Sequence, residues 1–179
     1  SEVQYDTGAV IETHNLVSYA SLGRQQQLVL RYDSLRADPR PILNFGWDDI
    51  RELFPPAFLA EPMVVAQTGF FRGESEVFEP LNFWRIPGGA TEINVALQAD
   101  LTDQPSGKYV YRIQTGFVPT PTGFKGLLPS TTVGQVLHVN TEASLFGRGW
   151  GLAGLQELVF NPDGSILLID GDGSEQVFE

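Results

Sequence analysis

Four oxygen-bearing side chains gather near the C-terminus in the stretch DGDGSE, where residue types and spacing come closest to a metal site. They are Asp170, Asp172, Ser174 and Glu175, and Ca²⁺ prefers oxygen ligands of these kinds. The helix–loop–helix calcium motif needs a third acidic or amide residue at alternating spacing and a distant glutamate, whereas strand-like segments flank this stretch. We therefore predict that folding needs no cofactor, with calcium at these residues as the weaker alternative.

The acidic stretches NPDG (161–164) and DGDG (170–173) also have the composition of tight turns. Glycine accepts a positive φ at little cost, and aspartate can hydrogen-bond to the backbone two residues further on. Asp163, Gly164 and Gly173 are accordingly predicted to shape hairpin tips between short apolar segments. On this interpretation the two stretches have a structural role.

The sequence lacks the residue patterns of the common hydrolases. It contains no cysteine, no G-x-S-x-G elbow and no H-E-x-x-H motif, and its two histidines are His14 and His138. His138 falls in a strand-like segment and is predicted to lie at the surface or rim. The acidic residues are scattered, so the sequence pairs no two of them for sugar hydrolysis. We predict that the protein is not an enzyme.

Aromatic residues offer a second kind of chemistry, because tryptophan can stack on sugar rings. The three tryptophans are Trp47, Trp84 and Trp150, and each has a sequence context more typical of a core position. Trp150 lies between glycines in GRGWGLAG, which let neighbouring backbone pass close by. We predict that its indole packs as a joint between two parts of the fold, with the N–H bonded to a carbonyl.

The charge and composition of the chain argue against some classes of binding partner. The chain has 179 residues, with 11 basic and 22 acidic residues and a net charge of −11, which argues against nucleic acid and anionic membranes. No apolar run approaches the about 20 residues of a membrane helix, and the N-terminus has no signal-peptide pattern. The absence of cysteine fits a large secreted or cell-surface protein that folds by core burial alone.

Apolar residues alternate with polar ones along most of the chain, as in half-buried antiparallel strands. The clearest strands are TEINVALQADL and KYVYRIQTGFV, which TDQPSG is predicted to join as a hairpin. A short helix or turn is expected over 47–54. Many short strands with turns between them predict an all-β fold. We expect an antiparallel immunoglobulin- or fibronectin-like sandwich over 1–141, and a glycine-rich turn with a C-terminal β-meander over 142–179.

Residues near the C-terminus resemble the segment that enters the shell of bacterial Rhs and YD-repeat proteins. That family has a G-x-G-W-x-L turn and then a D-x-D-G-x-x-x-x-F hairpin. The matching residues are Gly147, Gly149, Trp150 and Leu152, followed by Asp170, Asp172, Gly173 and Phe178. Upstream, LVLRYDS is similar to the family's L-x-Y-x-S strand, with Tyr32 at its centre. The layout is also similar to the fibronectin-like plug of animal teneurins.

The resemblance implies a non-enzymatic structural module that precedes a YD-type shell in a larger extracellular or cell-surface protein. The sequence ends within the last strand-like segment and contains no YD repeats, so we expect a longer parent chain. Its partners would be other domains of that chain. The alternatives are a self-associating subunit of a filament or adhesin, whose terminal strands pair with further copies, and a carbohydrate-binding module.

Overall fold

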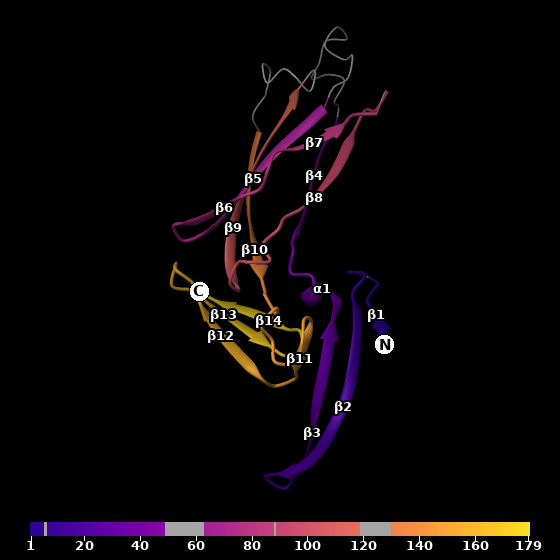
Figure 1. The fold of residues 1–179 in the computed structure, drawn as a ribbon, viewed down its shortest axis with the longest axis vertical. Coiled ribbons are helices and arrows are strands. Elements are labelled where there is room, and N and C mark those ends of the chain that lie inside the picture. Colours follow the sequence, from indigo (N-terminus) through magenta and orange to yellow (C-terminus); the bar gives the residue numbers. More distant parts are fainter. Residues whose placement is uncertain (6, 49–62, 88, 119–129) are drawn as a thin grey trace. The chain divides into compact units, whose positions relative to one another are not determined.

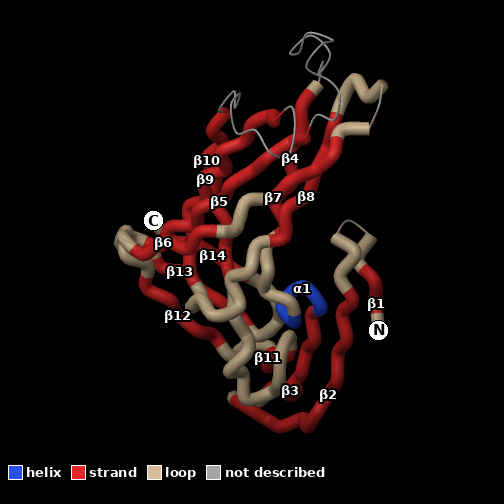
Figure 2. Tube along the Cα trace, turned by 45° about the horizontal axis from the view of Figure 1, so that its top comes forward, coloured by secondary structure: helices blue, strands red, loops and turns tan. Residues whose placement is uncertain are grey.

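The computed structural model describes residues 1–5, 7–48, 63–87, 89–118 and 130–179, and almost all of its regular structure is antiparallel β (Figures 1 and 2). This confirms the predicted fold class. The segments KYVYRIQTGFV, LQELVF, SILLID and SEQVFE form strands as expected. Most of the helix expected over 47–54, and nearly all of the connection over 118–130, lie outside the described residues. No helix among the described residues is long and apolar enough to cross a membrane.

The chain divides into two compact units. Unit 1 comprises 1–40, 101–108 and 137–179, and unit 2 comprises 41–100 and 109–136. This division differs from the expected one at 141/142, because the C-terminal strands pack with the N-terminal hairpin and not as a separate appendage. Short-range patterns carry no signal for such long-range pairing.

Unit 1 contains two antiparallel sheets. Its elements are β1 (Glu2–Val3), β2 (Val10–Ser21), β3 (Arg24–Asp33), α1 (Ser34–Ala37), β11 (Trp150–Leu152), β12 (Gln156–Phe160), β13 (Ile166–Asp170) and β14 (Glu175–Phe178). One sheet has the order β1-β2-β3-β11, and the other is the predicted meander β12-β13-β14. Leu167 and Ile169 of β13 pack with Val139 to form a small core.

Unit 2 is the sandwich part of the chain. Its elements are β4 (Ile42–Trp47), β5 (Met63–Arg72), β6 (Ser75–Phe78), β7 (Asn82–Arg85), β8 (Ile93–Gln98) and most of β9 (Gly107–Val118) and β10 (Ser130–His138). One sheet has the order β10-β9-β5-β6 with β7 also on β5, and the other is the pair β4-β8. Val64, Phe117 and Val95 join the two sheets in one core, against which Trp47 and Trp84 pack.

The predicted hairpin between 91–101 and 108–118 is wrong. Each segment is a strand with the predicted buried face, but β8 pairs with β4, and β9 pairs with β5. The connecting segment TDQPSG therefore joins strands of different sheets. Its turn composition is real, but a sandwich uses such turns for crossings between sheets as well as for hairpins.

Candidate functional site

The glycine-rich segment around Trp150 forms a short strand on the N-terminal hairpin. β11 pairs antiparallel with β3, with Trp150 opposite Tyr32 and Leu152 opposite Leu30. The indole lies 5.2 Å from the Tyr32 ring and 5.3 Å from the His14 ring, both at 47°. Trp150 is half-buried, and its backbone N–H donates to Gly147 O at 3.1 Å. The indole N–H has no hydrogen-bond partner among the described residues, so the predicted bond from the indole to a carbonyl is absent there. The family-like residues Tyr32 and Trp150 are thus in direct contact.

Gly149 lies where β11 comes closest to the end of β3. Its φ is +77°, and a Cβ added there would stand 2.8 Å from Ala37 Cβ, Asp33 O and Tyr32 Cε2. Its N–H donates to Thr141 Oγ1 at 2.9 Å, and its carbonyl accepts from Asp33 N at 2.9 Å. This position therefore needs glycine for both space and backbone conformation. Gly147, at φ +96°, stands in more open surroundings beside Trp150.

A second close approach joins β11 to the acidic turn at the end of β13. A Cβ on Gly151 would meet the backbone of Gly171, and a Cβ on Gly171 would meet the backbone of Leu152. The Gly171 N–H donates to Leu155 O at 3.1 Å. The sequence interpretation did not single out Gly151 or Gly171, although the spacing GWGL and DGDG places a glycine at each point of contact.

Arg36 of α1 fixes the same acidic turn from the other side. Its side chain is 10% exposed, and Nη1 donates to Asp170 O at 2.8 Å. Nη2 donates to Ser174 O and lies 3.2 Å from Glu175 Oε1. The sequence interpretation missed Arg36, since a single arginine in a loop-like stretch carries no signal of burial. Here it is the cation that satisfies the carbonyls of the turn.

The acidic side chains of DGDG hold the turn closed. Asp170 Oδ1 accepts from Gly154 N at 3.0 Å and from Asp172 N at 2.9 Å, and Oδ2 accepts from Gln156 Nε2 at 3.1 Å. Asp172 Oδ1 accepts from Ser174 N and Oγ. Burial would raise the pKa of Asp170, but the bonds from Gly154, Asp172 and Gln156 and the charge of Arg36 hold it below its usual value.

The NPDG turn has its own cation. Asp163 Oδ1 accepts from Ser165 N and Oγ, and Oδ2 lies 2.8 Å from Lys108 Nζ. The Lys108 amine, followed by the Ser165 hydroxyl, lowers the pKa of Asp163. Gly164, at φ +89°, closes the turn through its N–H to Asn161 O at 3.0 Å. Gly173, at φ +98°, closes the DGDG turn in the same way on Asp170 O. Both predicted hairpin tips are confirmed by the strand registers.

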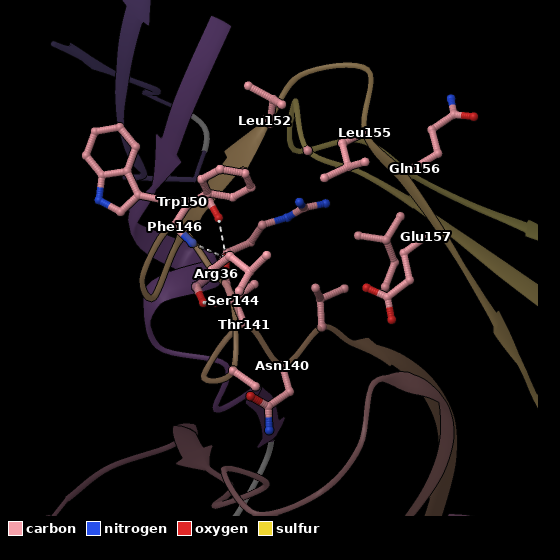
Figure 3. Close-up of a pocket in the computed structure, with 16 residues that line it drawn as sticks. Arg36, Asn140, Thr141, Ser144, Phe146, Trp150, Leu152, Leu155, Gln156 and Glu157 are labelled. Atoms are coloured by element: carbon pink, nitrogen blue, oxygen red, sulfur yellow. Dashed lines mark hydrogen bonds between the residues drawn. The ribbon is translucent and has the colours of Figure 1, made fainter.

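A hollow of about 420 Å³ lies beside β11 and the DGDG turn (Figure 3). Leu152 and Leu155 give it apolar walls, and Arg36, Gln156 and Glu157 give it polar groups. The indole of Trp150 points away from Arg36 and Leu155 (Figure 3). Ser144 Oγ, which also lines the hollow, donates to Trp150 O and accepts from Phe146 N. Among the described residues, no histidine lines it.

The prediction that His138 lies at the surface is wrong. Its side chain is 1% exposed, with Nδ1 3.0 Å from Pro39 O and Nε2 3.1 Å from Gln104 O. Burial lowers its pKa, against the opposing effect of the carbonyls of Gln104, Pro39 and Leu101. The residue pattern around His138 is compatible with burial of either face of the strand. The sequence alone therefore could not show whether the imidazole is buried or exposed. His14 is exposed, and its ring contacts the Trp150 ring at a tilt of 47°.

No family model matches this chain, and no curated protein matches it. Within the described ranges, no three His, Asp or Glu residues form a group that could hold a metal ion. The candidate site is therefore defined by the contacts within this structure and not by similarity to a known protein. Its centre, here called the glycine joint, consists of Tyr32, Arg36, Gly149, Trp150, Gly151, Asp170 and Gly171.

Trp150→Ala is expected to lower the free energy of unfolding by about 2–3 kcal/mol. The change removes two ring contacts and a half-buried indole. Its free-energy cost should therefore be smaller than that of removing a fully buried tryptophan. Urea unfolding of the full chain measures it. Leu145→Ala is the control, because Leu145 is 97% exposed and its loss should cost less than about 0.5 kcal/mol. An unchanged Trp150→Ala midpoint would show that the indole does not support the joint.

Calcium is expected to leave the thermal midpoint unchanged. Asp170 and Asp172 already accept hydrogen bonds from the backbone of their own turn, so calcium would have to displace those donors. The measurement compares melting in millimolar CaCl₂ with melting in chelator. A rise above about 10 °C with calcium would correspond to several kcal/mol of linked binding and would reverse the prediction. Asp172→Asn should then abolish that rise.

Proposed function

We propose that the chain is a non-catalytic structural module of a larger secreted or cell-surface protein of the Rhs and YD-repeat type, placed before the shell. One observation carries the proposal. The residues that resemble the family motif, far apart in sequence, form one interlocked structure in unit 1. Tyr32 contacts Trp150, Gly149 packs on the end of β3, and the turn that begins at Asp170 lies against β11.

The contacts of the motif's polar groups support a structural role. Asp170 and Asp172 accept hydrogen bonds from the backbone of their own turn, and the guanidinium of Arg36 donates to the carbonyls of Asp170 and Ser174. These hydrogen bonds rigidify the acidic turn, because each buried donor and acceptor would be costly to leave without its partner. An immunoglobulin- or fibronectin-like sandwich in unit 2 would then correspond to the plug of that family.

Electron microscopy of the whole parent polypeptide tests the proposal, together with the sequence beyond Glu179. We expect tandem Y-D-x-x-G-R repeats and a closed hollow particle. A parent chain without such repeats, or one that forms no hollow particle, would overturn the proposal.

One observation favours a second function, self-association into a filament. On the outer edge of β2, β1 pairs with Val10 and Ile11 only, and no other strand of the described residues pairs there. Leu16, Val17 and Tyr19 of that strand are 47–58% exposed, and an open edge of this kind templates pairing with another chain. Fibres in the same micrographs would favour this function over the shell module.

A further inference from the structure

The sheet of β6, β5 and β9 in unit 2 carries a shallow hollow of about 180 Å³ on the face opposite to buried Phe70. Its central residue is Gly69 of β5. The residues around it are Gln67, Phe71, Glu76, Phe78, Arg112 and Gln114. In the strand register Gly69 lies between Phe78 of β6 and Arg112 of β9, and Gln67 lies beside Gln114. The hollow is therefore lined by two aromatic rings, one cation, one carboxylate and two amides.

Gly69 makes the hollow by lacking a side chain. Its backbone is not among the positive-φ glycines, so the conformation itself does not require glycine. A Cβ there would stand 3.2–3.3 Å from side-chain atoms of Phe71, Glu76 and Phe78, which would have to move apart. A glycine within a strand weakens the strand and often marks a place where a ligand or another backbone approaches closely.

The polar groups of the hollow are unoccupied. Across the described part of the chain, the side chains of Gln67, Glu76 and Gln114 make no hydrogen bond or ion pair, and Arg112 makes only a cation–π contact, 5.2 Å above the Phe71 ring. Phe78 is 62% exposed, so its ring is open to solvent beside these polar groups. The exposed ring of Phe78 thus lies beside donors and acceptors that can all face the same ligand.

We propose that this hollow binds one uncharged pyranose ring of a glycan, a function that does not depend on the structural role proposed above. A pyranose has an apolar face of C–H groups, which packs on an aromatic ring such as Phe78. Its hydroxyls donate and accept, and they would meet Arg112 as donor, Glu76 as acceptor, and the two amides as both. One cation and one anion leave the hollow with no net charge, which favours a neutral sugar over an anionic one.

This places sugar stacking on phenylalanine and not on tryptophan. Trp47 and Trp84 pack against the core of the sandwich, and Trp150 packs on His14 and Tyr32. Phe78 carries no comparable sequence signal, because its exposure and its neighbour Gly69 become visible only once β5 and β6 are paired.

The test is an NMR titration of the full 179-residue chain with maltohexaose, cellohexaose, xylohexaose and chitohexaose, and with a heparin-derived hexasaccharide as the anionic probe. At least one neutral probe should shift the amides of Gly69, Phe78 and Arg112 saturably. Phe78→Ala should weaken that binding about tenfold or more, by removing the stacking surface. Gly69→Val should do the same by filling the hollow, since the atoms it meets belong to side chains that can turn outward.

Phe160→Ala is the matched control, because Phe160 is 70% exposed on β12 in the other unit and its loss should leave binding unchanged. The Gly69→Val result is used only if the amide spectrum of the variant, away from the hollow, matches that of the unsubstituted chain. If it does not match, Phe78→Ala alone decides the test, because Phe78 is exposed and its loss should not disturb the fold. Three results would overturn the proposal: no shift with any neutral probe, equal binding by the Phe78→Ala variant, or binding of the heparin hexasaccharide alone.

Discussion

Gly171→Ala is expected to destabilise the chain by about 3–4 kcal/mol, the largest effect of any methyl-sized change in the glycine joint. The added Cβ would run into the backbone nitrogen, carbonyl carbon and oxygen of Leu152. Backbone cannot rotate out of the way as a side chain can, so β11 would have to move off the turn. That movement would also lengthen the bond from Gly171 N to Leu155 O, now 3.1 Å.

Gly154→Ala provides the matched control for this prediction. Gly154 has a φ of +83°, but a Cβ there would meet nothing within 4 Å. The substitution should therefore cost only the about 1–2 kcal/mol of placing an L-residue in the left-handed region. Urea unfolding curves of both variants measure the difference. If Gly171→Ala costs no more than Gly154→Ala, the close approach of β11 to the turn does not stabilise the fold.

The local patterns of the sequence predicted the local parts of the fold. The alternation in 93–97 places Ile93, Val95 and Leu97 on the buried face, and the two acidic stretches are hairpin tips. Each of these features depends on a few consecutive residues. The same kind of pattern did not reveal β2, β4 or β6, whose exposed faces carry apolar residues among polar ones.

Strand pairing was the part that sequence could not supply. The alternation of apolar residues shows which face of a strand is buried, but it does not show which other strand it pairs with. For this reason β8 and β9 were wrongly predicted to pair with each other. His138 was misplaced for a related reason. The carbonyls that meet its ring belong to Pro39 and Gln104, which lie 99 and 34 residues away.

The candidate site shows the same division. Trp150, Gly149 and Asp170 were singled out from their composition, and the structure brings them into one region. Arg36 and Gly171 were not, because their importance depends on which segment each one touches. A buried arginine and a glycine at a backbone contact are both products of tertiary packing, whereas a tryptophan among glycines is visible in the sequence itself.

Arg36→Met is expected to lower the free energy of unfolding by about 3 kcal/mol. Methionine retains the apolar stem of the side chain but leaves the carbonyls of Asp170 and Ser174 without their donor. Hydrogen bonds to a charged group contribute about 1.5–3 kcal/mol each, and a buried acceptor left unsatisfied adds a desolvation cost. Loss of the charge also removes one of the influences that hold the pKa of Asp170 low, so that carboxyl should titrate at higher pH in the variant.

Arg40→Met separates the role of burial from the loss of a positive charge. Arg40 lies four residues further along the chain, is 43% exposed and pairs with Asp38, so the same substitution should cost less than about 0.5 kcal/mol. Urea unfolding gives both free energies, and ¹³C-detected titration of the Asp170 carboxyl gives its pKa in each variant. If Arg36→Met behaves like Arg40→Met in both measurements, the guanidinium does not hold the acidic turn. The joint would then depend on the contacts of β11 and on the hydrogen bonds within the acidic turn.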